Sequence, residues 1–348
     1  MNKSSSANID RTVPDREAMI ERVAALVPSL VERAEQVEKT RTIHPDTVQE
    51  FWDTQLWSIM KPKRYGGLEL DYGMMVVVPD YIARGCASTS WVYGNLVIHD
   101  WMLAMWPPQG QDTVWKDNPR ALMASSLVAN AGRATPVTGG YVISGRWPYC
   151  SGIDVSDWMM MGAMIQDDGP KRPVWLVVPR EKFEEIDTWY VSGLIGTGSR
   201  DVKCDDVFVP EFMTLDPKET RGGSTPGTPH NPGLVYQLPV LGLFPHLLVG
   251  TTIGIAQGAY DDYVREIRER VSTYNATKLA EHIQTQLKVA EAGALIQAAR
   301  LLTYDNIREA EVIMKSGRLP TVEDKVRWRR DGAFAAQNCI KSIQVLHS

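Results

Sequence analysis

The spacing of apolar residues divides the chain into a helical first region, a β-rich middle region and a helical last region. Residues 19–31 place apolar side chains along one helix face, and Asp15 stands at the expected N-cap. Pro28 interrupts this pattern and predicts a kink or a division of the helix. Further helices are predicted in the first region at 44–52, 72–84 and 88–106.

The middle region changes to short apolar runs separated by turns rich in Gly, Pro and Asp. Several short strands at this spacing are typical of an antiparallel β-sandwich or barrel. The runs lie at 121–128, 141–147, 159–165, 174–178 and 202–209.

The last region returns to helical spacing after residues 214–233, which are rich in Gly, Pro and Thr and predict a long mobile loop or linker. Helices are predicted at 250–270, 284–314 and 324–345. The chain is therefore expected to be an α+β multidomain protein. Its predicted parts are an N-terminal α-helical domain (15–115), a central β domain (116–213), the loop or linker (214–233) and a C-terminal α-helical domain (234–348).

Charge and length exclude several classes of protein. The 348 residues carry 37 Lys and Arg against 42 Asp and Glu, a formal net charge of −5, without a basic stripe. Nucleic-acid binding is therefore not expected. Residues 231–260 lack charged side chains over a length that would span a membrane, but they contain three prolines and His246. A buried segment of a soluble protein is the better interpretation, and no membrane association is expected.

Cysteine and histidine spacing argues against metal chemistry and secretion. The four cysteines lie far apart without a C-x-x-C pair, and the six histidines show no metal-type spacing. The first residues lack the apolar core of a secretory signal. We therefore expect reduced thiols, a cytoplasmic location and no bound metal.

The candidate chemistry gathers in a cluster of aromatic and hydroxyl residues at 147–152. Strand alternation predicts that Trp147, Tyr149 and Ser151 share one face and that Cys150 points to the other. Such a face suits a flat heterocycle, although an ordinary sheet face has the same composition. Ser125 and Ser126 on the preceding apolar run are expected to face the same cavity.

His99 is unusual because it lies in a largely apolar helix. A histidine in that position is either a satisfied core residue or a functional group. The sequence GTGSRD at 196–201 has only two glycines of a dinucleotide-binding loop and is better interpreted as a tight turn.

Extended stretches of the chain resemble flavin-dependent monooxygenases with the acyl-CoA dehydrogenase fold. More narrowly, they resemble the oxygenase components of two-component aromatic hydroxylases, such as the 4-hydroxyphenylacetate and 3-hydroxy-seco-androstadienetrione enzymes. The likeness runs from about Val23 to the last residue. It is carried by RYGGLELD, STSWV, HDWMLAMW, ASSLVANAG, GRATPVTGGYVISGRWPYCSGIDVSDW, GLIGTGSRDVKCDDVFVP and QLKVAEA.

The resemblance implies roles for individual residues. Ser151 falls on the family's W-x-[FYW]-x-S-G serine, which meets the flavin near N5, and the same motif implies flavin contacts for Tyr149 and Gly152. Ser126, or Ser125, falls on a hydroxyl position that faces flavin and substrate. The resemblance further implies substrate contacts for His99, as a catalytic residue beside the phenol, and for Trp147.

The resemblance also implies the reaction and its partners. FMN or FAD, reduced by a separate NAD(P)H-flavin reductase, would react with O2 to form a C4a-hydroperoxyflavin that hydroxylates a phenolic or polycyclic aromatic substrate. A homotetramer is implied as well. Relatives continue for several tens of residues beyond the point that matches Ser348, so the C-terminal domain is expected to be incomplete.

Two alternatives remain open from the residues alone. An acyl-CoA dehydrogenase-like enzyme would need a catalytic glutamate, for which Glu266 and Glu269 are the candidates. An inactive relative retained as a scaffold is the other.

Overall fold

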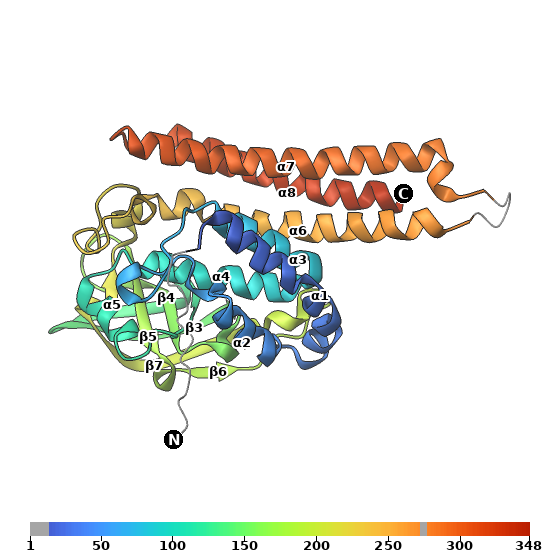
Figure 1. Ribbon diagram of the computed structural model, residues 1–348. Helices are drawn as coiled ribbons and strands as arrows, with labels where there is room; N and C mark the ends of the chain where they lie inside the picture. Colours follow the sequence, from blue (N-terminus) through green and yellow to red (C-terminus); the bar gives the residue numbers. More distant parts are fainter. Residues whose placement is uncertain (1–13, 272–276) are drawn as a thin grey trace, which may run out of the picture.

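The computed structural model describes residues 14–271 and 277–348, and the predicted helix–strand–helix order is confirmed within them (Figure 1). Among the N-terminal helices, α4 is largely buried and packs against α3 and against the sheet. These helices are α1 (Arg16–Thr40), α2 (Pro45–Asp53), α3 (Met74–Gly85), α4 (Ala87–Leu103) and α5 (Pro108–Trp115).

The predicted N-cap of α1 is confirmed, whereas the predicted effect of Pro28 and the number of helices in the first region need correction. The Asp15 carboxylate accepts a hydrogen bond from the Ala18 backbone N–H at 2.9 Å, as an N-cap does. Pro28 lies inside α1 without dividing it. Helix α5 is not predicted by the pattern, yet Pro108 begins it because proline is tolerated at the first position of a helix.

The central strands form one sheet in the order β6-β7-β3-β2-β4-β5-β8, with β1 paired to β4. The prediction of a purely antiparallel arrangement is wrong, because β1 and β2 both run parallel to β4. The chain forms the β2–β3 hairpin and then crosses to the other side of β2, so β4 runs in the direction of β2. The strands are β1 (Met123–Ser126), β2 (Gly132–Val137), β3 (Gly140–Cys150), β4 (Trp158–Ile165), β5 (Pro173–Pro179), β6 (Glu184–Ile186), β7 (Arg200–Pro210) and β8 (Thr214–Leu215).

Three long helices complete the molecule and lie side by side along one flank of it (Figure 1). They are α6 (Val240–Glu269), α7 (Ile283–Lys315) and α8 (Val322–His347). Helix α6 contacts α3 closely at Gly250, which has no side chain. A Cβ at this position would lie only 2.7 Å from the Val76 carbonyl oxygen. Among the described residues α6 alone is long and apolar enough to cross a membrane, but 61% of its most apolar window is buried inside the protein. It is a core helix, as its prolines and histidine predict.

Residues 214–233 are not the free linker that their composition suggests. They contain strand β8, which pairs with β5, and the buried side chain of Asn231. The Asn231 amide donates to the Ala104 carbonyl and to Gln111 Oε1, both at 2.8 Å. Buried amide contacts of this kind fix the segment against α5 and the end of α4.

Candidate active site

Helix α4 carries the two contacts around which the candidate site is built. Trp91 and His99 are eight residues apart, which corresponds to about 12 Å along the helix axis. Trp91 contacts the residues that follow β3, and His99 contacts β1. Helix α4 therefore connects the turn after β3 with strand β1.

The His99 side chain is fully buried and only one of its ring nitrogens is hydrogen-bonded. Nδ1 lies 2.9 Å from the Met123 carbonyl oxygen. A carbonyl only accepts, so Nδ1 carries the proton and Nε2 is an unprotonated acceptor. Among the described residues Nε2 has no hydrogen-bond partner. A buried acceptor without a partner is costly, and a ligand hydroxyl would satisfy it.

Burial also sets the charge of His99. It lowers the histidine pKa to about 4, and the bond to Met123 offsets only part of this effect. The ring is therefore neutral at pH 7.

The Ser151 hydroxyl is held in a network of buried side chains just after β3. The Trp91 indole N–H donates to Ser151 Oγ at 3.1 Å, and Ser199 Oγ lies 2.7 Å away. Ser199 in turn lies 2.7 Å from Thr197 Oγ1. Ser151 is 7% exposed, so its position is fixed by these contacts rather than by water.

The predicted alternation of side chains along β3 is wrong at its last residues. The pairing with β7 shifts register between Trp147 and Cys150, and Tyr149 has a positive φ of 62°. Trp147 and Cys150 therefore both lie in the core, while Tyr149 is 69% exposed. A bulge adds a residue to one strand and breaks the two-residue period.

Trp147 is a core residue of the sheet rather than a neighbour of Tyr149 on one face. Its indole N–H donates to the Gly162 carbonyl at 2.6 Å. Its ring packs directly on Gly132 and Gly145, where a Cβ would collide with it. Tyr149 instead packs edge-on against Trp189, with ring centroids 6.3 Å apart.

Gly152 brings the turn after β3 directly against α4. Its φ is +72°, and a Cβ there would lie 2.7 Å from Val92 Cγ1. Its backbone N–H donates to the Thr197 carbonyl at 3.0 Å. Glycine is therefore required both by backbone conformation and by space.

Ser125 and Ser126 lie on β1 in register with Met160 and Met161 of β4. Ser126 is buried and Ser125 is partly exposed. Neither hydroxyl makes a hydrogen bond within the described part of the chain. Both are free to bind a ligand, and β1 is also the strand whose Met123 carbonyl fixes His99.

The sequence pattern missed the polar groups beside the two predicted catalytic side chains, His99 and Ser151. Trp91 is part of STSWV, and Thr197 and Ser199 are part of GTGSRD, so the resemblance contained them without giving them a role. A buried ion pair was also missed. Lys61 Nζ lies 3.5 Å from Asp100 Oδ2 and donates to the Pro119 carbonyl at 2.6 Å.

The Lys61–Asp100 pair fixes the end of α4 beside His99. Burial raises the pKa of Asp100 to about 6, although Lys61 acts in the opposite direction. Nothing in the sequence spacing links the two residues, because they come from separate segments.

The glutamates needed for acyl-CoA dehydrogenase chemistry are not in a site. Glu266 and Glu269 are exposed at the end of α6, and Glu266 pairs with Arg270 at 3.1 Å. No group of His, Cys, Asp and Glu side chains in the described ranges could hold a metal ion.

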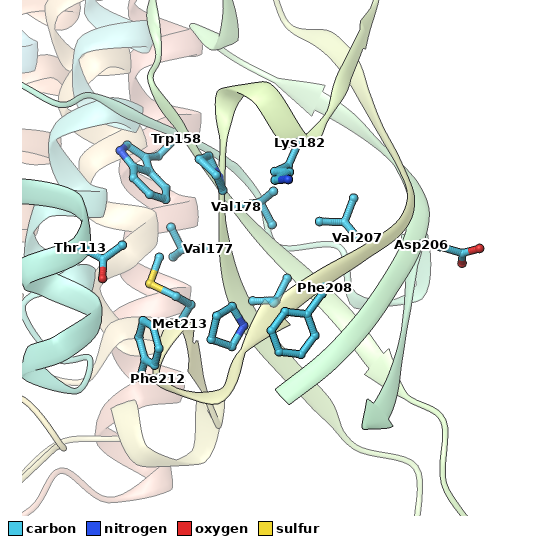
Figure 2. A pocket seen from close by; sticks show the side chains of 13 residues that line it. Thr113, Trp158, Val177, Val178, Lys182, Asp206, Val207, Phe208, Phe212 and Met213 are labelled. Atoms are coloured by element: carbon cyan, nitrogen blue, oxygen red, sulfur yellow. The ribbon is translucent and has the colours of Figure 1, made fainter. Parts of the chain in front are cut away.

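The hollow between β5 and β7 is a separate feature of the sheet (Figure 2). It has a volume of about 480 Å³ and is lined mainly by apolar side chains, among them Trp158, Phe208 and Met213. None of the seven predicted site residues lines it.

Comparison with known proteins gives the family. Residues 14–113 match the acyl-CoA dehydrogenase N-terminal domain, and residues 247–348 match the acyl-CoA dehydrogenase C-terminal domain. The chain belongs to the flavin-dependent monooxygenases that share the acyl-CoA dehydrogenase fold. The predicted family and fold are thereby confirmed.

Among its relatives is the flavin-dependent monooxygenase oxygenase subunit HsaA of Rhodococcus jostii, 33% identical over 94% of this chain and 86% of the relative. The FADH2-dependent resorcinol hydroxylase oxygenase component of a Rhizobium species is 32% identical over 100% of this chain and 87% of the relative. The crystal structure of 3-HSA hydroxylase from Rhodococcus sp. RHA1 superposes with a TM-score of 0.89, at 31% identity over 96% of this chain and 86% of that one. A structure of XiaF from a Streptomyces species, at 25% identity and a TM-score of 0.87 over 96% of this chain and 85% of that one, was solved with FADH2.

The residues present fit a flavin. Ser151 Oγ accepts one hydrogen bond from Trp91 and shares a second with Ser199, so one hydrogen-bonding position of the hydroxyl remains for a ligand. Ser125 and Ser126 offer unbonded hydroxyls, and His99 Nε2 is an unbonded buried acceptor. These groups lie along the contacts that α4 makes with β1 and with the turn after β3.

Proposed function

We propose that this protein is the oxygenase component of a two-component flavin-dependent monooxygenase that hydroxylates a phenolic or polycyclic aromatic substrate. The observation that carries the proposal is the buried, neutral His99 with its unpartnered Nε2. A phenol hydroxyl is the donor that this acceptor lacks. Relatives named as aromatic hydroxylases support the same substrate class.

His99 accepts a hydrogen bond from the substrate phenol and takes its proton as oxygen is transferred. A phenol has a pKa of about 10 and keeps its proton beside a weak base. When the aromatic ring of the phenol attacks the electrophilic oxygen, its C–O–H group becomes a protonated carbonyl. A protonated carbonyl is a far stronger acid than the phenol. His99 then acts as the general base. Because the ring is fully buried, the substrate reaches Nε2 only when side chains at the α4–β1 contact move apart.

Ser151, Gly152, Tyr149 and Ser126 bind the flavin in this proposal, and Ser125 or Ser126 faces the substrate. When bound, reduced FMN or FAD reacts with O2 and supplies the electrophilic oxygen. The protein itself orients the flavin ring against α4 and excludes water from the site. Trp147, for which the resemblance implies a substrate contact, is instead fully buried in the core of the sheet and supports this arrangement from there.

The partners follow from the same proposal. A separate NAD(P)H-flavin reductase supplies the reduced flavin, in keeping with relatives named as oxygenase components. We infer that the protein associates with itself because apolar side chains on α7 and α8, including Leu287, Leu301 and Phe334, are exposed in the single chain. The resemblance implies that the assembly is a homotetramer. We infer a cytoplasmic location because all four cysteines are free and buried.

The test combines the purified protein with a flavin reductase, NADH, FMN or FAD, a panel of phenols and isotopically labelled O2. The expected result is a hydroxylated phenol that carries one labelled oxygen atom. His99→Asn should lower the rate by about 10²-fold or more. Ser151→Ala should raise the hydrogen peroxide formed per NADH several-fold.

The alternatives give different results in the same experiment. If an acyl-CoA bleaches bound oxidised flavin without any reductase, the protein is a dehydrogenase. If neither redox form of the flavin binds at micromolar protein, it is a scaffold. Equal product yield from the wild type and from the His99→Asn, Ser151→Ala double variant would show that the assigned roles are wrong.

A further inference from the structure

The hydroxyl network behind Ser151 has a fixed direction. Thr197 Oγ1 lies 2.9 Å from the Leu194 carbonyl, which only accepts, so the Thr197 proton is committed to it. Ser199 must then donate to Thr197, across 2.7 Å. Ser151 must in turn donate to Ser199, also across 2.7 Å.

The other side of Ser151 agrees with this direction. The Trp91 indole N–H can only donate, and it donates to Ser151 Oγ. Ser151 therefore has no proton left for a ligand, and it has one lone pair left. All three hydroxyl side chains are buried, so water does not compete for these bonds.

The far end of the network is anchored to the backbone. The Leu194 carbonyl also accepts the indole N–H of Trp189 at 3.1 Å. The Glu38 carboxylate of α1 accepts the backbone N–H groups of Ile195 and Gly196. The turn that carries Thr197 and Ser199 is thus held on both sides, and reversing the chain of protons would break the Thr197–Leu194 bond.

We propose that Thr197 and Ser199 are positioning residues that make Ser151 a hydrogen-bond acceptor and thereby select reduced over oxidised flavin. The inference rests on the proposed function, in which Ser151 binds the flavin, and on the resemblance, which implies that this contact lies near N5. Reduced flavin carries a proton on N5 that the free lone pair of Ser151 accepts. Oxidised flavin presents a lone pair at N5. This lone pair faces the free lone pair of Ser151 unless Ser151 gives up its hydrogen bond to Ser199.

The test measures the affinities of oxidised and dithionite-reduced FMN and FAD under anaerobic conditions, together with the midpoint potential of the bound flavin. The variants are Ser199→Ala and Thr197→Val. Ser199→Ala removes the acceptor of the Ser151 proton. Thr197→Val removes the acceptor of the Ser199 proton, so Ser199 can donate to Ser151 instead. In both variants Ser151 then has a proton for the flavin. We expect oxidised flavin to bind about tenfold more tightly relative to reduced flavin, the worth of one hydrogen bond. The midpoint potential should fall by about 30 mV for this two-electron couple.

Two controls separate proton direction from packing. Thr197→Ser keeps the hydroxyl and should keep the wild-type ratio. Ser156→Ala removes a neighbouring buried hydroxyl that donates to the Gly152 carbonyl at 2.8 Å, outside the network, and should also keep the ratio.

Each outcome decides a different question. If neither flavin form binds the wild type, the proposed function and this inference both fail. If reduced flavin binds preferentially but both variants behave like Ser156→Ala, the inference is overturned and the function stands. A ratio that changes in Ser199→Ala and not in Thr197→Val would mean that Ser199 acts by contact alone, which also overturns the inference.

Discussion

The neutral state of His99 follows from two contacts of its ring. The Met123 carbonyl takes the Nδ1 proton, and burial makes a second proton costly at Nε2. In the proposed reaction the ring therefore acts as an acceptor without first losing a proton. An exposed histidine, with a pKa near 6.5, would be partly charged at neutral pH and would repel a developing positive charge.

This state predicts the pH dependence of the rate. A pKa of about 4 means that His99 stays neutral as the pH is lowered through 6.5. For the free enzyme, kcat/KM on a phenol should therefore stay level from about pH 7 to about pH 5 and fall only near the lower value. The profile is measured by product formation with saturating reduced flavin, after checking that the protein remains folded.

His99→Asn is the matched variant for the pH profile. It should lower kcat/KM at every pH by about 10²-fold or more and remove the acid limb that titrates near pH 4. A wild-type acid limb near pH 6.5 that disappears in His99→Asn would contradict the lowered pKa of His99.

At the scale of elements, the turn after β3 depends on how closely it approaches α4. Gly152 and Gly139 both have positive φ, but only Gly152 has a neighbour, Val92, within contact distance of a Cβ. Both alanine variants should lose about 1 kcal/mol through the left-handed backbone. Gly152→Ala should lose about 1–3 kcal/mol more, because the added methyl pushes α4 away.

Urea unfolding of the two variants measures this difference. Gly139→Ala is the control for backbone strain alone, since nothing lies within 4 Å of its added Cβ. Gly152→Ala should also weaken binding of reduced flavin. Equal losses of stability in the two variants would show that the turn does not need its close contact with α4.

Most helices and strands can be predicted from the sequence, but the pairing of the strands cannot. The helices other than α5 and most strands follow from apolar spacing, which depends only on local period. Strand β2 carries a weak signal because four of its six residues, Arg133, Thr135, Pro136 and Val137, are exposed. It is recognised only through its pairing with β3. The parallel pairs of β4 depend on how the chain crosses the sheet, which no local pattern encodes.

The site residues divide in the same way. His99 and Ser151 can be predicted as site residues because their motifs are contiguous in the chain. Trp91, Ser199 and Thr197 come from separate segments, and their connection is a matter of tertiary distance. Alternation placed Trp147 beside Tyr149 incorrectly, because the register shift in β3 depends on its pairing with β7.

At the scale of the whole molecule, the C-terminal helices are attached to the rest through buried polar contacts as well as apolar ones. Arg300 of α7 pairs with the buried Asp80 of α3 at 3.1 Å. His246 of α6 lies 3.3 Å from the Leu243 carbonyl through Nδ1 and 3.3 Å from the Asn306 amide of α7 through Nε2. Nε2 accepts from that amide, so this contact between α6 and α7 requires a neutral His246.

Acid should therefore loosen the whole molecule. Burial lowers the pKa values of His99 and His246 to about 4. Between about pH 4 and 6.5 the unfolded chain binds protons at both histidines that the folded protein does not bind, so the free energy of unfolding falls as the pH falls. Each histidine contributes up to about 1.4 kcal/mol per pH unit in this window. Asp100 acts in the opposite direction, because its pKa of about 6 lets the folded protein keep a proton that the unfolded chain releases.

Replacing His246 by Gln measures the contribution of this histidine to the pH dependence of the free energy of unfolding. The variant should be less stable than the wild type at about pH 7 and should lose about 1–2 kcal/mol less between about pH 7 and about pH 5, because one proton-binding site of the unfolded chain is gone. Urea unfolding followed by tryptophan fluorescence measures the difference. The exposed His230→Gln is the control and should keep the wild-type loss. If His246→Gln loses as much stability as the wild type over this range, His246 is not held neutral by the contact between α6 and α7, and the acid sensitivity of the molecule must come from His99 or from the carboxylates.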